Sequence, residues 1–352
     1  MSSHSPAGRG RVTVVGTGTW GTTLAILAAR QGRATYLLAR TEEEAGSLQS
    51  ARENRRFMPG YPFPPNLAVT WDPSRAVDGC DMLLMVVPSQ TMRANIRTLK
   101  PHLGSSKPIV VSCAKGLELG SLLRMTEVLE QELGEDWKGQ LGALSGPNLA
   151  KEIVAGRPAT TVIGAEDKDV AQRAQDLLTG GRFRVYTNPD IVGVEMAGAL
   201  KNIIALAAGM ADGMEAGDSS KAALITRGLV EIGRLGMAAG ASLFTFAGLA
   251  GLGDMIATCA SPLSRNRLMG QELARGKTME EMRATMGGQI AEGVTTTVAA
   301  RELAARYNIE MPITEQLYQI LFEGKPPLDG LNALLTREPT DEFLSLGVPM
   351  AT

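Results

Sequence analysis

Three glycines near the start of the chain constrain its fold more than any other feature. In VVGTGTWGTTLA, Gly16, Gly18 and Gly21 follow a G-x-G-x-x-G spacing. The apolar run 11–15 before them predicts a buried strand, and residues 22–30 after them predict a helix. A strand, these glycines and a helix together are typical of a dinucleotide-binding turn, in which a helix N-terminus holds a pyrophosphate. An ordinary glycine-rich βα turn is the alternative.

The end of the next predicted strand, residues 34–39, bears on the choice of dinucleotide. NAD-binding folds usually carry an acidic residue there that accepts a hydrogen bond from the ribose 2′-hydroxyl. This chain has Arg40 instead, and a guanidinium pairs with a 2′-phosphate. The sequence therefore predicts NADPH as the preferred cofactor, with NADH possible, because the glutamates at 42–44 would weaken the preference.

Further apolar runs predict more strands of a parallel sheet, buried on both faces: 82–87, 109–113 and 141–144. Ligands of open α/β sheets bind at the carboxyl ends of the strands. The residues that follow these runs are therefore candidates for the reactive end of the cofactor: Pro88, Ser89, Lys115, Gly116, Ser145, Gly146, Pro147 and Asn148. Lys115 is the most interesting, although a surface lysine in a loop is the plain alternative.

The sequence pattern changes after Pro189. Short strand-like runs give way to long Ala-, Leu-, Met- and Gly-rich segments, which predict helices. We expect an α/β fold with a Rossmann-type, mostly parallel sheet in residues 1–190. An all-helical domain would occupy 191–325 and a C-terminal extension 326–352. A catalytic cleft between the two domains is the expected arrangement.

Composition narrows the class of partner. The net charge of −2 and pI near 5.9 indicate no nucleic-acid partner. The N-terminus has no apolar signal segment, and the three cysteines are scattered, which together favour a cytoplasmic protein. The uncharged stretch 235–253 approaches the length of a membrane span, but its glycines favour helix ends and turns, so we expect no integral membrane segment.

Elimination restricts the acid/base group of an enzyme with this fold. The only histidines are His4, in the N-terminal tail, and His102, in a predicted loop, so a histidine-based dehydrogenase is not indicated. No tyrosine makes a Tyr-x-x-x-Lys pair, and catalytic zinc does not fit so few Cys and His ligands. A lysine or a carboxylate remains.

Lys201 is the strongest candidate. It is the only cation in the long apolar segment EMAGALKNIIALAAGMADG, and Asn202 follows it. Burial lowers the pKa of a lysine, which makes it a working acid/base near neutrality. The alternative is a structural lysine that reaches solvent or pairs with Glu195.

Two later motifs support this reading. Asp254 and Thr258, in GLAGLGDMIATC, would share one face of a helix, and Asp254 is the natural partner for Lys201. The motif SPLSRNRLMG then predicts a helix start carrying Ser264, Arg265 and Asn266, with Arg267 beyond. A guanidinium, a hydroxyl and a helix N-terminus form a suitable site for a substrate phosphate.

Taken together, these motifs are more specific than any one of them. The segments GTGTWGTTLA, VVPSQ, CAKGLE, SGPNLAKE, VEMAGALKNIIALAAGMADG, LITRGLVEI, GLAGLGDMIATC, SRNR and AEGV occur in order over residues 11–325. In this the chain resembles the NAD(P)-dependent glycerol-3-phosphate dehydrogenases of the soluble bacterial type. The resemblance implies interconversion of dihydroxyacetone phosphate and sn-glycerol 3-phosphate, a precursor of phospholipids.

The resemblance also implies roles for individual residues. Lys201 would be the proton acceptor in oxidation, and Lys115 would meet both substrate and cofactor. The implied supporting and binding residues are Asn202, Asp254 and Thr258, which orient the lysine and the substrate; Ser264, Arg265, Asn266, Gly146 and Asn148 for the substrate; and Gly16, Gly18, Thr19, Trp20, Gly21, Arg40, Ala150, Arg265, Ile290 and Glu292 for the cofactor. Trp20 and Asn148 stand at positions that vary in the family.

The implied reaction is hydride transfer to the ketone carbon, with Lys201 donating a proton to its oxygen and Lys115 stabilising the developing charge. Two other functions stay open at this stage: a β-hydroxyacid dehydrogenase of similar build, and a nucleotide-sensing protein without catalysis. The apolar Ala- and Gly-rich helices favour a homodimer.

Overall fold

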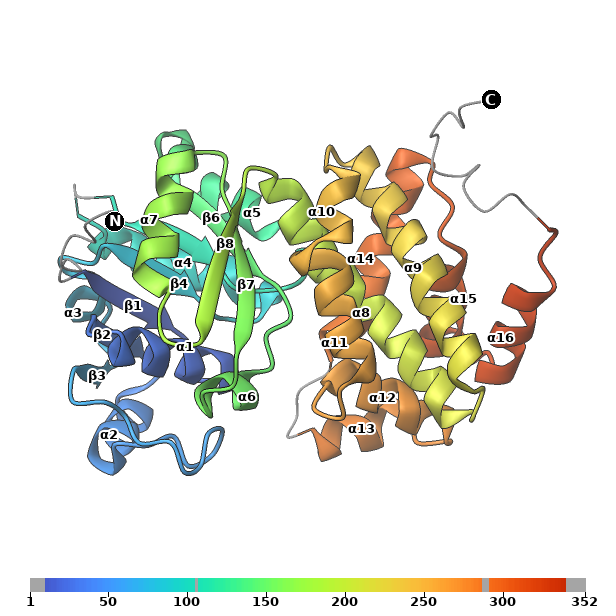
Figure 1. Ribbon diagram of the computed structural model, residues 1–352, viewed down its shortest axis with the longest axis horizontal. Coiled ribbons are helices and arrows are strands. Elements are labelled where there is room, and N and C mark those ends of the chain that lie inside the picture. Colours follow the sequence, from blue (N-terminus) through green and yellow to red (C-terminus); the bar gives the residue numbers. More distant parts are fainter. Residues whose placement is uncertain (1–9, 105–106, 287–290, 340–352) are drawn as a thin grey trace, which may run out of the picture. The chain divides into compact units, whose positions relative to one another are not determined.

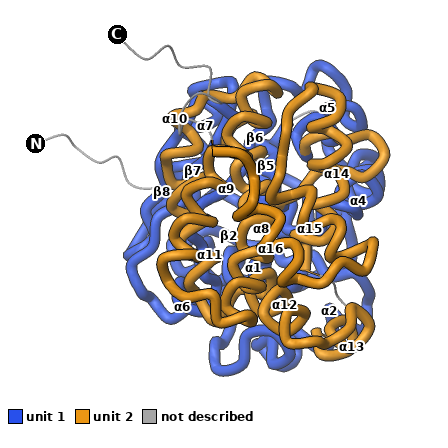
Figure 2. Tube along the Cα trace, turned by 90° about the vertical axis from the view of Figure 1, so that its right-hand side faces the viewer, with its two compact units in different colours: residues 1–114, 125–191 blue, residues 115–124, 192–352 orange. Residues whose placement is uncertain are grey.

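A computed structural model describes residues 10–104, 107–286 and 291–339 of the chain (Figure 1). The chain divides into two compact units (Figure 2). The first comprises residues up to 114 and 125–191, and the second comprises 115–124 and the residues from 192 onward. The short segment 115–124 therefore belongs with the C-terminal residues. The predicted boundaries at 190 and 325 remain predictions.

The first unit contains an eight-stranded sheet in the order β3-β2-β1-β4-β5-β6-β7-β8. Its strands are β1 (Arg11–Val15), β2 (Ala34–Leu38), β3 (Leu67–Thr70), β4 (Met82–Met85), β5 (Ile109–Ser112), β6 (Leu141–Ser145), β7 (Ala159–Gly164) and β8 (Phe183–Asn188). Only the β6–β7 pair is antiparallel, which confirms the predicted mostly parallel sheet. Strands β3, β7 and β8 were not located from the sequence.

Helices cover both faces of this sheet. Helix α1 (Thr19–Arg30) contacts both α6 (Ala150–Val154) and α7 (Lys168–Leu178) around the main apolar core, and α4 (Met92–Leu99) and α5 (Met125–Leu133) pack together, with α5 against β6. The remaining short elements are α2 (Glu42–Ala51), α3 (Pro73–Val77), η1 (Ser89–Thr91), η2 (Lys100–His102) and η3 (Glu135–Gln140). Strands β4 and β5 are buried along their whole length, as their continuous apolar runs predict.

The direction in which successive strands are added to the sheet changes between β1 and β4. Strands β1, β2 and β3 run outward on one side and β4, β5 and β6 on the other, so the carboxyl ends of β1 and β4 form the switch point at which such sheets bind ligands. The three glycines follow β1 directly. The fold therefore places the predicted phosphate loop where a doubly wound sheet holds its ligand.

The second unit is helical. No strand occurs in the described residues from 192 to 339. Its elements are α8 (Ile191–Gly213), α9 (Asp218–Ala238), α10 (Leu243–Ala247), the π-helical turn η4 (Leu249–Gly253), α11 (Asp254–Ala260), α12 (Arg265–Ala274), α13 (Met279–Thr285), α14 (Glu292–Tyr307), α15 (Pro312–Phe322) and α16 (Pro327–Leu335). The uncharged stretch 235–253 is broken into the end of α9, α10 and this turn, as its glycines indicate.

Helix α8 is the core of this unit. It is long and apolar enough to cross a membrane, but 83% of its most apolar window is buried within the protein, as in the core helix of a globular domain. Its contact with α12 depends on absent side chains: a Cβ at Gly209 would lie 1.9 Å from the Arg267 carbonyl oxygen, and one at Gly270 would lie 1.9 Å from that of Leu206. Glycine therefore lets the two backbones touch, which sets α12 close beside α8.

Candidate active site

The glycine loop of the first unit has the geometry of an anion cradle. Gly16 has φ = 109°, and a Cβ there would lie 2.4 Å from the Val86 carbonyl oxygen. A Cβ at Gly21 would lie 1.9 Å from the Gly16 carbonyl oxygen. At Gly18, by contrast, a Cβ would have no neighbour within 4 Å. Gly16 and Gly21 are thus required by the fold, whereas the space above Gly18 suits a ligand.

Helix α1 supplies the charge for this cradle. Gly18 is its N-cap residue, no side chain caps the helix, and its first turn holds no acidic residue. The first amide N–H groups of a helix lack partners within the helix, and the helix dipole adds a partial positive charge. The residues of this loop therefore fit the pyrophosphate of a dinucleotide. Thr19 and Trp20 lie half-buried in the same first turn.

A buried asparagine that the sequence reasoning missed holds this loop. The Asn54 side chain is 2% exposed, and its Nδ2 donates to the Thr17 carbonyl oxygen at 2.7 Å and to Thr22 Oγ1 at 2.8 Å. Its Oδ1 accepts from the Phe57 N–H. No sequence signal marks Asn54, because a single asparagine in a polar loop has no pattern of its own.

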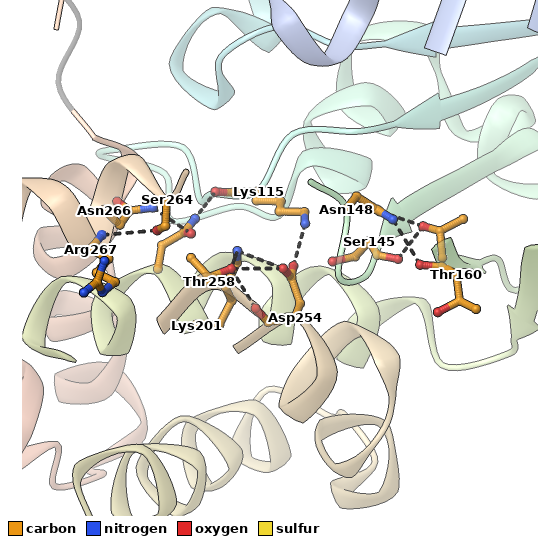
Figure 3. Close-up of polar contacts among 12 residues, drawn as sticks. Lys115, Ser145, Asn148, Thr160, Lys201, Asp254, Thr258, Ser264, Asn266 and Arg267 are labelled. Carbon is orange, nitrogen blue, oxygen red and sulfur yellow. Dashed lines mark hydrogen bonds and ion pairs between the residues drawn. The ribbon is translucent and has the colours of Figure 1, made fainter. Parts of the chain in front are cut away.

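The loop after β6 is also held from within the first unit. Gly146 has φ = 138°. Asn148 Nδ2 donates to the Thr160 carbonyl oxygen at 3.0 Å, and Asn148 Oδ1 accepts from Thr161 Oγ1 at 2.9 Å (Figure 3). Much of the hydrogen-bonding capacity of the Asn148 amide is therefore used against β7. Ala150 begins α6, and Arg40 is exposed after β2.

Four predicted residues of the second unit form one buried cluster. Lys201 Nζ on α8 donates to Asp254 Oδ1 at 3.0 Å and to Thr258 Oγ1 at 2.5 Å (Figure 3). Lys115 Nζ donates to Asp254 Oδ2 at 2.5 Å. Asp254 and Thr258 lie one turn apart on α11, which confirms the predicted pairing of Lys201 with Asp254. The side chains of Lys201 and Asp254 are only 6% and 4% exposed.

Two contacts fix the segment that carries Lys115 to α8, and a backbone bridge joins the two ends of the segment. Glu195 accepts from Arg124 Nη1 at 2.7 Å, so this carboxylate, the alternative partner considered for Lys201, binds an arginine. Asn202 Nδ2 donates to the Lys115 carbonyl oxygen at 3.3 Å, and the backbones at Leu117 and Arg124 form an isolated bridge. Residues 115–124 thereby join the helical unit, although they leave from a strand of the first.

The charges of the cluster shift one another's pKa values. Burial lowers the pKa of Lys201 more than the Asp254 carboxylate raises it, and the Lys115 ammonium lowers it further. Burial would raise the pKa of Asp254, but the ammonium groups of Lys115 and Lys201 more than offset this and lower it. Asp254 therefore keeps its negative charge more readily than an exposed aspartate, while Lys201 loses its proton more readily than an exposed lysine.

The proposed phosphate residues begin α12. Ser264 is its N-cap, with Oγ accepting from the Arg267 N–H at 3.2 Å, and Arg265 is exposed in its first turn. Asn266 Nδ2 donates to Asn202 Oδ1 at 2.9 Å, and its Oδ1 accepts from the Gly293 N–H at 2.8 Å. A cation beside a helix N-terminus suits an anion.

Two further charged groups border this helix start. The Arg267 guanidinium donates to Asp212 at 2.6 Å, and Asp212 also binds Lys221, a cluster that the sequence did not reveal. Burial raises the pKa of Glu292, and the positive charges of Arg265, Lys201 and Lys115 oppose that rise. Ile290, the other predicted cofactor contact near α14, lies outside the described residues.

Comparison with known proteins finds one family along the chain. Residues 11–171 match the model of the NAD-dependent glycerol-3-phosphate dehydrogenase N-terminus, and residues 190–332 match that of its C-terminus. The glycerol-3-phosphate dehydrogenase (NAD(P)+) of Dehalococcoides mccartyi is 47% identical over 334 residues, covering 95% of this chain and 92% of its own. That of Moorella thermoacetica is also 47% identical, covering 95% and 98%.

A solved structure extends the match to three dimensions. The crystal structure of glycerol-3-phosphate dehydrogenase from Coxiella burnetii superposes with a TM-score of 0.88 at 37% identity, covering 94% of this chain and 99% of that one. The two family models, the relatives and this structure agree over nearly the whole chain. The chain belongs to the NAD-dependent glycerol-3-phosphate dehydrogenase family.

Proposed function

We propose that the protein interconverts dihydroxyacetone phosphate and sn-glycerol 3-phosphate with NADPH as the preferred cofactor and NADH as an alternative. The observation that carries this proposal is the buried Lys115–Asp254–Lys201 cluster, with an anion-binding helix start in the same unit. The family named above supports the reaction. The nicotinamide, when bound, supplies or accepts the hydride at the substrate carbon.

Lys201 moves the proton. An ammonium has three N–H donors, and its contacts with Asp254 and Thr258 use two of them. The third position is where a substrate oxygen would bind. In reduction, Lys201 donates its proton to the carbonyl oxygen as that oxygen becomes a hydroxyl; in oxidation, the neutral amine accepts that proton. The lowered pKa of Lys201 makes its neutral form more accessible than that of an exposed lysine.

Asp254 and Lys115 support this transfer. The Asp254 carboxylate holds both lysines, one on each oxygen, so that the two nitrogens stay close together. Lys115 keeps a positive charge near the oxygen on which negative charge develops, which stabilises the transition state. Thr258 accepts from Lys201 and donates to the Asp254 carbonyl oxygen, which restricts the lysine to one rotamer.

The N-terminus of α12 would hold the substrate phosphate through Ser264, Arg265 and the amide groups of its first turn. With both of its amide atoms bound inside the protein, Asn266 would act partly by fixing Asn202. The roles of Gly146 and Asn148 toward the substrate, and of Ala150, Glu292 and Ile290 toward the cofactor, remain predictions. We also propose a soluble cytoplasmic homodimer that supplies glycerol 3-phosphate for phospholipid synthesis.

Initial rates of NADPH and NADH oxidation, with dihydroxyacetone phosphate and with unphosphorylated dihydroxyacetone, test this function. We expect turnover with the phosphorylated ketone, little with dihydroxyacetone, and a higher kcat/KM for NADPH. Equal turnover of the two ketones would contradict the phosphate site. Oxidation only with β-keto acids would indicate the hydroxyacid dehydrogenase, and binding of nucleotide without any turnover would indicate the sensor.

A further inference from the structure

A glutamate joins the glycine loop to the residue expected to read the ribose. Glu44, in the first turn of α2, accepts from Thr17 Oγ1 through Oε1 at 2.5 Å and from the Arg40 N–H through Oε2 at 3.1 Å. The Glu44 N–H in turn donates to Oγ1 of the helix cap Thr41. Hydrogen bonds therefore hold both the carboxylate and the backbone N–H of Glu44.

The place of this carboxylate follows from the sheet. Val15 and Leu38 pair at the carboxyl ends of β1 and β2, and the Gly16 N–H donates to the Leu38 carbonyl oxygen. Thr17 and Arg40 extend from those two ends, so Glu44 bridges the pyrophosphate loop and the ribose position. In NAD-binding folds an acidic residue at this edge accepts from the ribose 2′-hydroxyl.

The chemistry of the two cofactors differs at this point. A carboxylate offers about four acceptor positions, and the contacts of Glu44 with Thr17 and Arg40 leave room for a hydroxyl donor. Toward a 2′-phosphate the same group is repulsive, since the phosphate carries nearly two negative charges and the bound carboxylate cannot turn away. Arg40 and Glu44 therefore act in opposite directions on the choice between NADPH and NADH.

We propose that Glu44 is a specificity residue for the nucleotide ribose. It accepts from a 2′-hydroxyl, opposes a 2′-phosphate, and so limits the NADPH preference conferred by Arg40 and keeps NADH usable. This assignment rests on the proposed nucleotide site, but it concerns the ratio of two affinities and not whether catalysis occurs.

The test is the binding of two fragments by calorimetry, adenosine 2′,5′-bisphosphate and AMP, to the wild type and to Glu44→Gln. Glutamine keeps the shape: its oxygen can accept from the Arg40 N–H while its NH₂ donates to the Thr17 hydroxyl. We expect the affinity ratio of bisphosphate to AMP to rise about tenfold, the size for a single and a double charge a few ångström apart in water. The NADPH-to-NADH ratio of kcat/KM should rise in parallel.

Two further variants make the result specific. Glu43→Gln removes a charge from an exposed residue of the same helix turn and should change the ratio less than about twofold. Arg40→Leu should lower the ratio. An unchanged ratio in Glu44→Gln, or an equal rise in Glu43→Gln, would overturn the assignment; Glu44→Ala provides the same comparison if the glutamine variant is unstable. If neither fragment binds the wild type, the nucleotide site fails and this assignment with it, whereas the ketone assay is judged separately.

Discussion

The glycine loop of the first unit and the lysine cluster of the second bind charge by opposite means. At the glycine loop, the positive charge that would attract an anion comes from the backbone N–H groups and the dipole of α1, not from side chains. The cluster relies on three paired ionisable side chains from distant parts of the chain, of which Lys201 and Asp254 are buried and Lys115 is half-buried. Backbone donors hold an anion without titrating, whereas buried side chains can change protonation. Backbone N–H groups therefore suit the binding of an anion, and ionisable side chains suit the transfer of a proton.

Substitution of Lys201 in the lysine cluster should cause the greatest loss of activity. Lys201→Ala removes the proton carrier and should lower kcat by about 10²- to 10⁴-fold, the range for general acid/base catalysis. Nucleotide affinity should stay unchanged, because the glycine loop contains no part of the cluster. Steady-state kinetics and calorimetry check the two halves of this prediction. Lys277→Ala, at a half-exposed lysine paired with Glu272, is the control and should retain full activity; a Lys201→Ala variant within tenfold of wild type would rule out the proton role.

The proposed phosphate site of the second unit should give the next largest loss of activity. Arg265→Ala should lower kcat/KM for dihydroxyacetone phosphate by about a hundredfold, the upper range for a charge-assisted hydrogen bond. The low rate with unphosphorylated dihydroxyacetone should change little. Arg275→Ala, at the other end of α12, is the matched control. An equal loss with both ketones would show that Arg265 does not bind the phosphate.

Each unit contains glycines at which the backbone packs directly against another backbone segment. Gly21→Ala forces a Cβ to within 1.9 Å of the Gly16 carbonyl oxygen, and Gly270→Ala does the same at Leu206. Each should destabilise the protein by about 3 kcal/mol, the upper range for overpacking, and lower Tm by several degrees. Thermal unfolding measures this. A variant with wild-type Tm would mean that the backbones do not touch at that glycine.

Gly18 should behave differently from its neighbours. An added methyl group meets no protein atom, and the backbone at φ = −63° accepts alanine, so Tm should change little. Nucleotide affinity should nevertheless fall about tenfold to a hundredfold, because the methyl group occupies the space of the phosphate and costs about one charge-assisted hydrogen bond. Wild-type affinity in Gly18→Ala would argue against a pyrophosphate at this position.

The same contrast explains what the sequence could predict. The glycine loop is a local pattern, so its strand, turn and helix were predictable, and β1 has the predicted bounds. Strand β8 was missed because its first residues alternate between buried and exposed, and β7 was missed because its first two residues are only half-buried and follow an exposed segment. The pairing of Lys201 with Asp254 was predictable because an aspartate at the start of an apolar helix needs a partner, and Lys201 is the only cation in the apolar segment 195–213.

Other features depended on tertiary contacts that no local pattern encodes. Lys115 was identified by its place after a strand, but its membership of the helical unit depends on Asn202 and on the Arg124–Glu195 ion pair. The Asp212 cluster behind Arg267 and the support of the loop by Asn54 join residues far apart in the sequence. Single polar residues of this kind acquire meaning only when their partners are known.

Proton transfer by Lys201 under the influence of Asp254 can be tested through the pH dependence of kcat/KM for sn-glycerol 3-phosphate oxidation in the wild type and in Asp254→Asn. Oxidation needs the neutral amine, so the rate should rise with pH through the pKa of Lys201. The Asp254 carboxylate raises that pKa, so its removal should lower the whole curve and shift its ascending limb to lower pH. If kcat/KM fell in Asp254→Asn but its ascending limb stayed at the wild-type pH, a group other than Lys201 would be the one that titrates. That result would contradict the proton role of Lys201.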